Sequence, residues 1–315
     1  MSAPLHRTYR DYSGVKIVGT QRVKLPTTQL HMERAYYVMA QLEAPVYGTV
    51  QSYDGAGISG GPPHWVAVYP HQKGKPQGHL WALIHALLTA QIPSSKGFQA
   101  LLDEHNLQVS SKGKLVSTLS GYVLPGTEVI DLIAPPNGKV PRSGPKWRQA
   151  VKWAQAFHLL LDDPAGLEIQ KAFTIDWLLR TQYKTESIVY DYNDFDPDGT
   201  EADPASLMVA TDEVALIHEL PLWTDIAMCA YHAFSVNAPG TAVRALRWAQ
   251  KREPELRSWA FAEHLIWKLG TSSYGNWKVR YRRTRSVMRD SELWPKEMLE
   301  QLMPLRLPGS AKGFR

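Results

Sequence analysis

The chain has 315 residues, of which 44% are hydrophobic and 21% are charged, with a formal net charge of +5 and a pI near 9.1. This composition indicates a globular chain with one large or two modest cores. No apolar run of about 18 residues is present, so no membrane-spanning helix is expected. A single cysteine, Cys229, excludes an intrachain disulfide and most thiolate metal sites.

An amphipathic helix is predicted over residues 30–43, because apolar side chains recur there at helical spacing. Pro45 stops this helix and favours an extended conformation at Ala44, which places Glu43 in the last turn. The C-terminal end of a helix carries partial negative charge and disfavours an ionised carboxylate. Glu43 is therefore a candidate proton donor, as a general acid requires.

A β-hairpin is predicted directly after this helix. Residues 47–53 favour a strand, and Asp54-Gly55 is a strong turn signal before a return strand that begins at Ile58-Ser59. The hairpin would place Asp54 across a cleft from Glu43. Two carboxylates on facing walls fit the acid-plus-base or acid-plus-nucleophile chemistry of glycoside hydrolysis.

These residues together resemble the active-site segment of the lysozyme-like superfamily, which includes phage-type lysozymes, goose-type lysozymes and chitosanases. In the phage-type pattern a catalytic Glu ends a helix, an Asp lies on a hairpin, and a Thr or Ser follows on the return strand. The resemblance implies that Glu43 is the general acid, Asp54 the second carboxylate and Ser59 the hydroxyl that positions water. It also implies an α+β fold, mainly α: a lysozyme-like helical fold with a small β-hairpin at the active-site cleft.

Ring-bearing side chains beside these residues are candidates for substrate binding, because pyranose rings stack on aromatic faces. The candidates are Tyr47, Tyr53, His64 and Trp65. The aromatic rings equally suit a hydrophobic core.

The rest of the chain is predicted to be largely helical. A stretch rich in proline and glycine at 134–145 marks a boundary between an N-terminal part (1–135), which holds the catalytic helix and hairpin, and a helical part (136–315). The two parts could form one continuous lysozyme-like domain. Strands are expected within 107–133. Helices are predicted at 80–91, 97–106, 146–161, 166–182, 210–219, 222–235, 240–251, 254–269 and 292–302.

No cofactor or metal site is predicted. The eleven histidines include no His-Glu-x-x-His pair, and no glycine pattern fits a phosphate or dinucleotide. The acidic loop 191–203 matches the first half of a calcium-binding loop but has Ala205 where the second half needs a glutamate. An acidic surface turn and a different kind of calcium site both stay open. Cys229 lies on the predicted apolar helix 222–235 and is interpreted as a core residue.

Five basic residues occur within eight positions near the C-terminus: Lys278, Arg280, Arg282, Arg283 and Arg285. Such a cluster can bind an anionic polymer of the cell wall or a nucleic acid, or it can simply form a solvated face. We expect attachment to an anionic wall polymer rather than a role in bond cleavage.

The sequence therefore predicts a peptidoglycan-degrading glycosidase, muramidase- or lysozyme-like, that cleaves the glycan strands of the bacterial cell wall. Glucosaminidase, lytic transglycosylase and chitosanase activities stay open. The N-terminus lacks the apolar core of a signal peptide. We expect synthesis in the cytoplasm and delivery to the wall within a phage particle, at lysis or by a specialised secretion system. Alternatives are a non-catalytic glycan-binding or phage structural protein with the same fold, and a nucleic-acid-binding protein.

Overall fold

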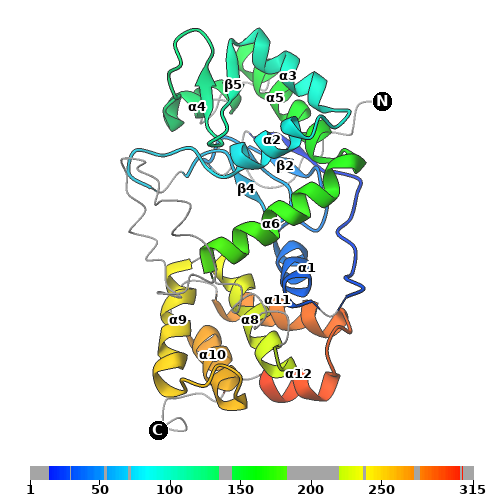
Figure 1. Cartoon of the computed structure of the whole chain (residues 1–315), viewed down its shortest axis with the longest axis vertical. Helices are drawn as coiled ribbons and strands as arrows, with labels where there is room; N and C mark the ends of the chain where they lie inside the picture. The colour runs from blue at the N-terminus through cyan, green and yellow to red at the C-terminus, as the bar shows by residue number, and fades with distance from the viewer. Residues whose placement is uncertain are drawn as a thin grey trace. The chain divides into compact units, whose positions relative to one another are not determined.

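The structure is a computed structural model that describes residues 14–28, 30–52, 55–69, 72–134, 144–182, 220–236, 239–272, 277–305 and 307. The described chain is mainly helical with two small antiparallel sheets (Figure 1), which confirms an α+β fold that is mainly α. No described helix is both long and apolar enough to cross a membrane.

The chain divides into two compact units, each formed by two separate segments. Unit 1 comprises Met1–Val23 and Glu43–Thr174, and unit 2 comprises Lys24–Leu42 and Ile175–Arg315. The boundary expected near residue 135 therefore falls inside unit 1. Most of the N-terminal helix with Glu43 at its end belongs to unit 2, because its apolar face packs there.

Unit 1 contains a four-stranded antiparallel sheet in the order β1-β2-β3-β4. The strands are β1 (Lys16–Ile17), β2 (Val50–Gln51), β3 (Ser59–Gly60) and β4 (Trp65–Val66). β2 and β3 form the predicted hairpin, with Gln51 opposite Ser59 and Val50 opposite Gly60. A Cβ atom at Gly60 would lie 2.8 Å from the Leu161 side chain, so the sheet approaches its covering helix closely at this point.

The helices of unit 1 surround an aromatic core. They are α2 (Leu80–Thr89), α3 (Ser95–Glu104), α4 (Gly126–Ile133), α5 (Pro145–Leu161), the short η1 (Pro164–Gly166) and the first part of α6 (Leu167–Gln182), with β5 (Leu107–Val109) and β6 (Leu115–Ser117) as a second sheet. Phe157 on α5 is buried against Phe98 and Trp81, with ring centroids 5.0 and 5.5 Å away in edge-to-face arrangements. α5 also packs on β1, β2 and β3, which joins the core to the sheet.

Unit 2 is a group of helices around α8. Its members are α1 (His31–Glu43, through Leu42), the second part of α6 from Ile175, α8 (Leu222–Ser235), α9 (Pro239–Arg252), α10 (Trp259–Thr271), α11 (Trp277–Asp290) and α12 (Lys296–Leu302). Every side chain of α8 from Thr224 to Ser235 is buried, and α9, α10, α11 and α12 pack against this helix. Polar groups on α8 must therefore find partners inside the unit.

Several predicted elements differ from the observed ones. The Val129–Ile133 run was expected as a strand, but it lies on α4, where Val129 and Ile133 are buried and Asp131 is exposed. α10 begins at Trp259 because Ser258 caps it by accepting a hydrogen bond from the Phe261 amide. α12 begins only after Pro295, and α11 was not predicted as a helix. The predicted helix 210–219 and the acidic loop 191–203 lie outside the described residues.

Candidate functional site

Glu43 is the last residue of α1, as predicted, and it is half-buried. The backbone after it is held in place within unit 1. The Val23 amide donates to the Pro45 carbonyl (2.9 Å), and the Tyr47 amide donates to the Gln21 carbonyl (2.8 Å). The backbone that leads from Glu43 to β2 is therefore fixed by pairing with an earlier segment of the chain.

The β2–β3–β4 sheet brings several predicted site residues together. Ser59 on β3 lies opposite Gln51 on β2 and opposite Val66 on β4. His64, in the turn before β4, has its Nδ1 atom 3.4 Å from Nε2 of Gln51. Gln51 and His64 are half-buried, whereas Ser59 is only 1% exposed. Gln51 is thus a polar neighbour of the site that the sequence did not single out.

The predicted aromatic binding residues are buried where the structure describes them. Tyr47 is 5% exposed and Trp65 is 6% exposed. The Trp65 ring lies edge-on to Phe173 and His79, with centroids 5.4 and 6.1 Å away. These two residues pack in unit 1 and do not present an open ring face. Tyr53 and Asp54 lie outside the described residues.

The C-terminus of α1 receives a positive charge from α11. Nη2 of Arg283 donates to the carbonyl of Leu42, the residue before Glu43, over 3.1 Å. A guanidinium at a helix C-terminus balances the partial negative charge there. The negative end of α1 is therefore paired with a cation at Leu42, which the sequence did not indicate.

Two further arginines of α11 also bind the C-terminal ends of helices. Nε of Arg280 donates to Ala233 O in the last turn of α8 (3.0 Å), and Nε of Arg285 donates to Met303 O at the end of α12 (2.5 Å). Carbonyls at helix C-termini have no partner within their own helix, so these contacts satisfy them. α11 thus joins three helices of unit 2.

These contacts correct the prediction that the basic cluster is a single attachment surface. Arg285 is buried, with 6% exposure, and Arg280 is half-buried. Arg282 and Arg283 are exposed, and Arg283 is engaged with α1 as well. The side chain of Lys278 lies outside the described part. Sequence alone could not separate these roles, because basic residues in a row give no sign of which carbonyls they meet.

A second polar site lies inside unit 2, around Asp225 of α8. Its carboxylate accepts three hydrogen bonds: Oδ1 from Nδ1 of His31 (2.5 Å), and Oδ2 from Nη1 of Arg34 (2.7 Å) and Nε1 of Trp294 (2.5 Å). Burial alone would raise the pKa of Asp225, but the hydrogen bonds from His31, Arg34 and Trp294 outweigh burial and lower it. Asp225 is therefore an ionised group inside the core.

Cys229 and His232 of α8 complete this cluster. The Cys229 sulfur lies 3.7 Å from both His31 Nδ1 and Asp225 Oδ1, and Nε2 of His232 lies 3.4 Å from Nε2 of His31. Burial and then the Asp225 charge raise the pKa of the Cys229 thiol well above its usual value. Burial and then the His31 charge lower the pKa of His232. A protonated thiol this deep in the core is not a nucleophile.

This cluster was not predicted from the sequence. Asp225, Cys229 and His232 are spaced i, i+4, i+7, which places them on one face of a helix, and this spacing was the available signal. His31 lies 194 residues before Asp225. Nothing in a single sequence shows that α1 packs against α8.

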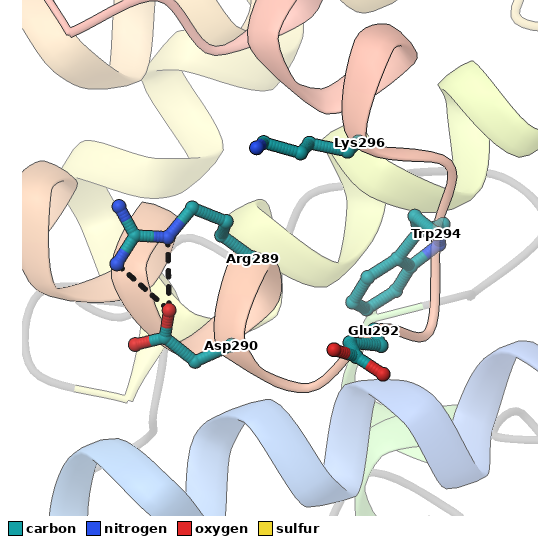
Figure 2. Close-up of a pocket in the computed structure, with 5 residues that line it drawn as sticks. All are labelled: Arg289, Asp290, Glu292, Trp294 and Lys296. Carbon is teal, nitrogen blue, oxygen red and sulfur yellow. Dashed lines mark hydrogen bonds and ion pairs between the residues drawn. The ribbon is translucent and has the colours of Figure 1, made fainter.

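A pocket of about 580 Å³ lies beside the cluster, between the end of α11 and the start of α12 (Figure 2). It is lined by Arg289, Asp290, Glu292, Trp294 and Lys296. Arg289 and Asp290 pair with each other at 2.7 Å. Trp294 lines this pocket and also donates to Asp225, so a single side chain connects the pocket and the buried cluster.

Comparisons with known proteins found no matching family model, no matching curated protein and no matching solved structure.

Proposed function

We propose that this protein is a glycoside hydrolase that cleaves the glycan strands of peptidoglycan, with Glu43 as the general acid. The observation that supports this proposal is the position of Glu43. It is a half-buried carboxyl group at the end of α1, and the fixed backbone after it leads directly into the β2–β3 hairpin. A general acid needs such a restrained carboxyl group beside a surface where substrate can lie.

In the proposed reaction the Glu43 carboxyl donates its proton to the glycosidic oxygen as the bond to the anomeric carbon breaks. A water molecule supplies the hydroxyl group to that carbon and returns a proton. Asp54 is proposed as the second carboxylate, which activates the water or stabilises the positive charge of the transition state. Ser59 is buried in the free protein, so we expect a smaller contribution from its hydroxyl than from Asp54.

The test is Glu43→Gln, because the amide keeps the shape of the side chain but cannot donate the proton. We expect wall-degrading activity to fall by roughly 10²–10⁴-fold without loss of the fold. Activity is measured by mass spectrometry of the fragments released from purified peptidoglycan, and the fold by circular dichroism.

Glu33→Gln is the matched control, because Glu33 lies in the first turn of the same helix and its side chain bonds to Thr28. This variant should retain full activity. Fragment release by a folded Glu43→Gln protein at the wild-type rate would refute the proposal. Wall binding without any fragment release by the wild-type protein would instead indicate a non-catalytic glycan-binding protein.

A further inference from the structure

We propose that His31, Asp225 and Cys229 form a binding site for a divalent transition-metal ion of the zinc type inside unit 2. The site is independent of Glu43 and of the proposed hydrolase activity. An imidazole nitrogen, a carboxylate oxygen and a sulfur atom converge there from α1 and α8. All three residues are buried.

The distances among the three atoms fit a small metal ion. His31 Nδ1, Asp225 Oδ1 and Cys229 Sγ form a triangle with sides of 2.5, 3.7 and 3.7 Å. The point equidistant from the three atoms lies about 2.0 Å from each of them. This distance matches zinc–nitrogen and zinc–oxygen bonds, and it is slightly shorter than the roughly 2.3 Å of a zinc–sulfur bond. For tetrahedral coordination, His31 Nδ1 and Asp225 Oδ1 must move apart from 2.5 Å to about 3.3 Å, whereas the two 3.7 Å distances to sulfur already suit it.

The neighbouring groups are those that hold metal ligands in place. Asp225 would bind the metal through Oδ1, while Oδ2 keeps its hydrogen bonds to Arg34 and Trp294. His31 would bind through Nδ1, and its Nε2 atom faces His232. A ligating histidine normally uses its second nitrogen in such a contact, and a ligating carboxylate is normally hydrogen-bonded on its free oxygen.

The donor atoms decide the class of ion. A sulfur ligand disfavours Mg²⁺ and Ca²⁺, which prefer oxygen, whereas Zn²⁺ and Co²⁺ accept nitrogen, oxygen and sulfur together. On binding, the Cys229 thiol and Nδ1 of His31 each lose a proton to solvent; the sulfur then forms a metal–thiolate bond and Nδ1 a metal–nitrogen bond in place of its hydrogen bond to Asp225. Thiolate and carboxylate then offset two of the three positive charges that the ion and Arg34 bring together. Three protein ligands leave a fourth position for one buried water.

The pocket in Figure 2 offers a route for the ion. Trp294 lines this pocket, and its indole donates a hydrogen bond to the Asp225 carboxylate. Trp294 is 5% exposed and belongs to the core of unit 2, so it must move for an ion to reach the carboxylate by this route. The charged residues of this lining balance, with Asp290 and Glu292 against Arg289 and Lys296.

The experiment uses the full chain, stripped of metal with a chelator and then titrated with Zn²⁺ or Co²⁺. We expect one equivalent of zinc per chain by elemental analysis, and a rise in melting temperature on adding zinc. Co²⁺ should produce the intense near-ultraviolet absorption of a cobalt–thiolate bond. This absorption reports on Cys229 directly, because the chain has no other cysteine.

Cys229→Ser should fold, since serine has nearly the same shape, but should lose the cobalt–thiolate absorption and most of the zinc-induced rise in melting temperature. Trp294→Phe should weaken zinc binding by about 10–100-fold, as expected for a residue that supports a ligand. His85→Gln, which changes a histidine of unit 1, is the control and should bind like wild type.

Failure of the folded wild-type chain to bind zinc or cobalt after stripping would overturn the proposal. Equal binding by wild type and Cys229→Ser would also overturn it, because the metal would then lie elsewhere on the chain. The cluster would in that case be a buried hydrogen-bonded network that binds no metal ion.

Discussion

His79, the residue before α2, is a neutral imidazole enclosed by aromatic rings. Its ring lies edge-on to Trp65 and Tyr69, with centroids 6.1 and 5.7 Å away. Burial and then the nearby charge of Lys114 lower the pKa of His79 to about 4. The imidazole in the unfolded chain titrates near its ordinary value of about 6.5. Between these two values the unfolded chain binds a proton that the folded chain does not.

Unit 1 should therefore lose stability as the pH falls from about 6.5 to about 4, and the full contribution of His79 is present above 6.5. The loss is at most about 3 kcal/mol and smaller in practice, because the residue is only half-buried. The His79→Gln variant should show a flatter dependence. Urea unfolding of both proteins at several pH values from 4 to 7.5 provides the measurement. Identical slopes would contradict the prediction.

The positions of single residues could be predicted from the sequence only where neighbouring residues determine them. Glu43 could be placed at the end of α1 because Pro45 acts on its own neighbours. The roles of Tyr47 and Trp65 could not be decided, since an aromatic ring that stacks on sugar and one that packs in a core look alike. The partners of Asp225 come from α1 and from Trp294, far from it in the chain. Only tertiary packing brings them together.

Among the elements, α11 holds other helices by their C-terminal carbonyls. Arg285 is buried and donates to Met303 O, while Arg282 on the same helix is exposed. Arg285→Gln should lower the free energy of unfolding by about 1–3 kcal/mol, because a buried carbonyl loses its charged donor. Arg282→Gln should stay within about 0.5 kcal/mol of wild type.

Denaturant unfolding of the two variants beside wild type measures this difference.

The Arg282→Gln and Arg285→Gln variants also test attachment to anionic polymers. A surface role for the cluster requires that Arg282→Gln weaken binding to purified walls at low salt. An equal loss of stability in both variants would show that the contact at Met303 contributes little.

Element prediction succeeded where a helix has a long apolar face and failed where short signals compete. The helix 222–235 was predicted with its observed bounds. The Val129–Ile133 run consists of apolar and β-branched residues around one aspartate, and so few residues fit a strand and a helix equally well. The structure selects the helix because Val129 and Ile133 then share one buried face. α11 was not predicted because it has few apolar residues among many basic ones, so no apolar helix face stands out in its sequence.

The whole chain is organised as two units that exchange a segment. α1 lies in the sequence between the two segments of unit 1, but Ala35, Val38 and Leu42 of α1 belong to the core of unit 2. A destabilising substitution in the apolar face of α1 should therefore lower the stability of unit 2. Val38→Asp buries a charge without a partner, which costs more than about 3 kcal/mol.

Hydrogen exchange should then show lost protection in α8 of unit 2 and preserved protection in α5 of unit 1. Gln41→Lys, which places a charge at a half-buried position near the C-terminus of the same helix, where a cation is favoured, is the control and should leave both helices protected. Equal loss of protection in α5 and α8 would indicate that the two units unfold as one.

The placement of α1 also has a consequence during protein synthesis. The ribosome releases α1 early, whereas its partner α8 begins at Leu222, nearly 180 residues later. Protein synthesis adds about 5–20 residues per second, so the apolar face of α1 lacks its partner α8 for roughly 10–40 s. Unit 1, which ends at Thr174, has all of its residues before α8 is made. The nascent chain thus passes through a stage in which unit 1 can fold while α1 stays uncovered, and a chaperone that binds apolar helices has that interval in which to protect it.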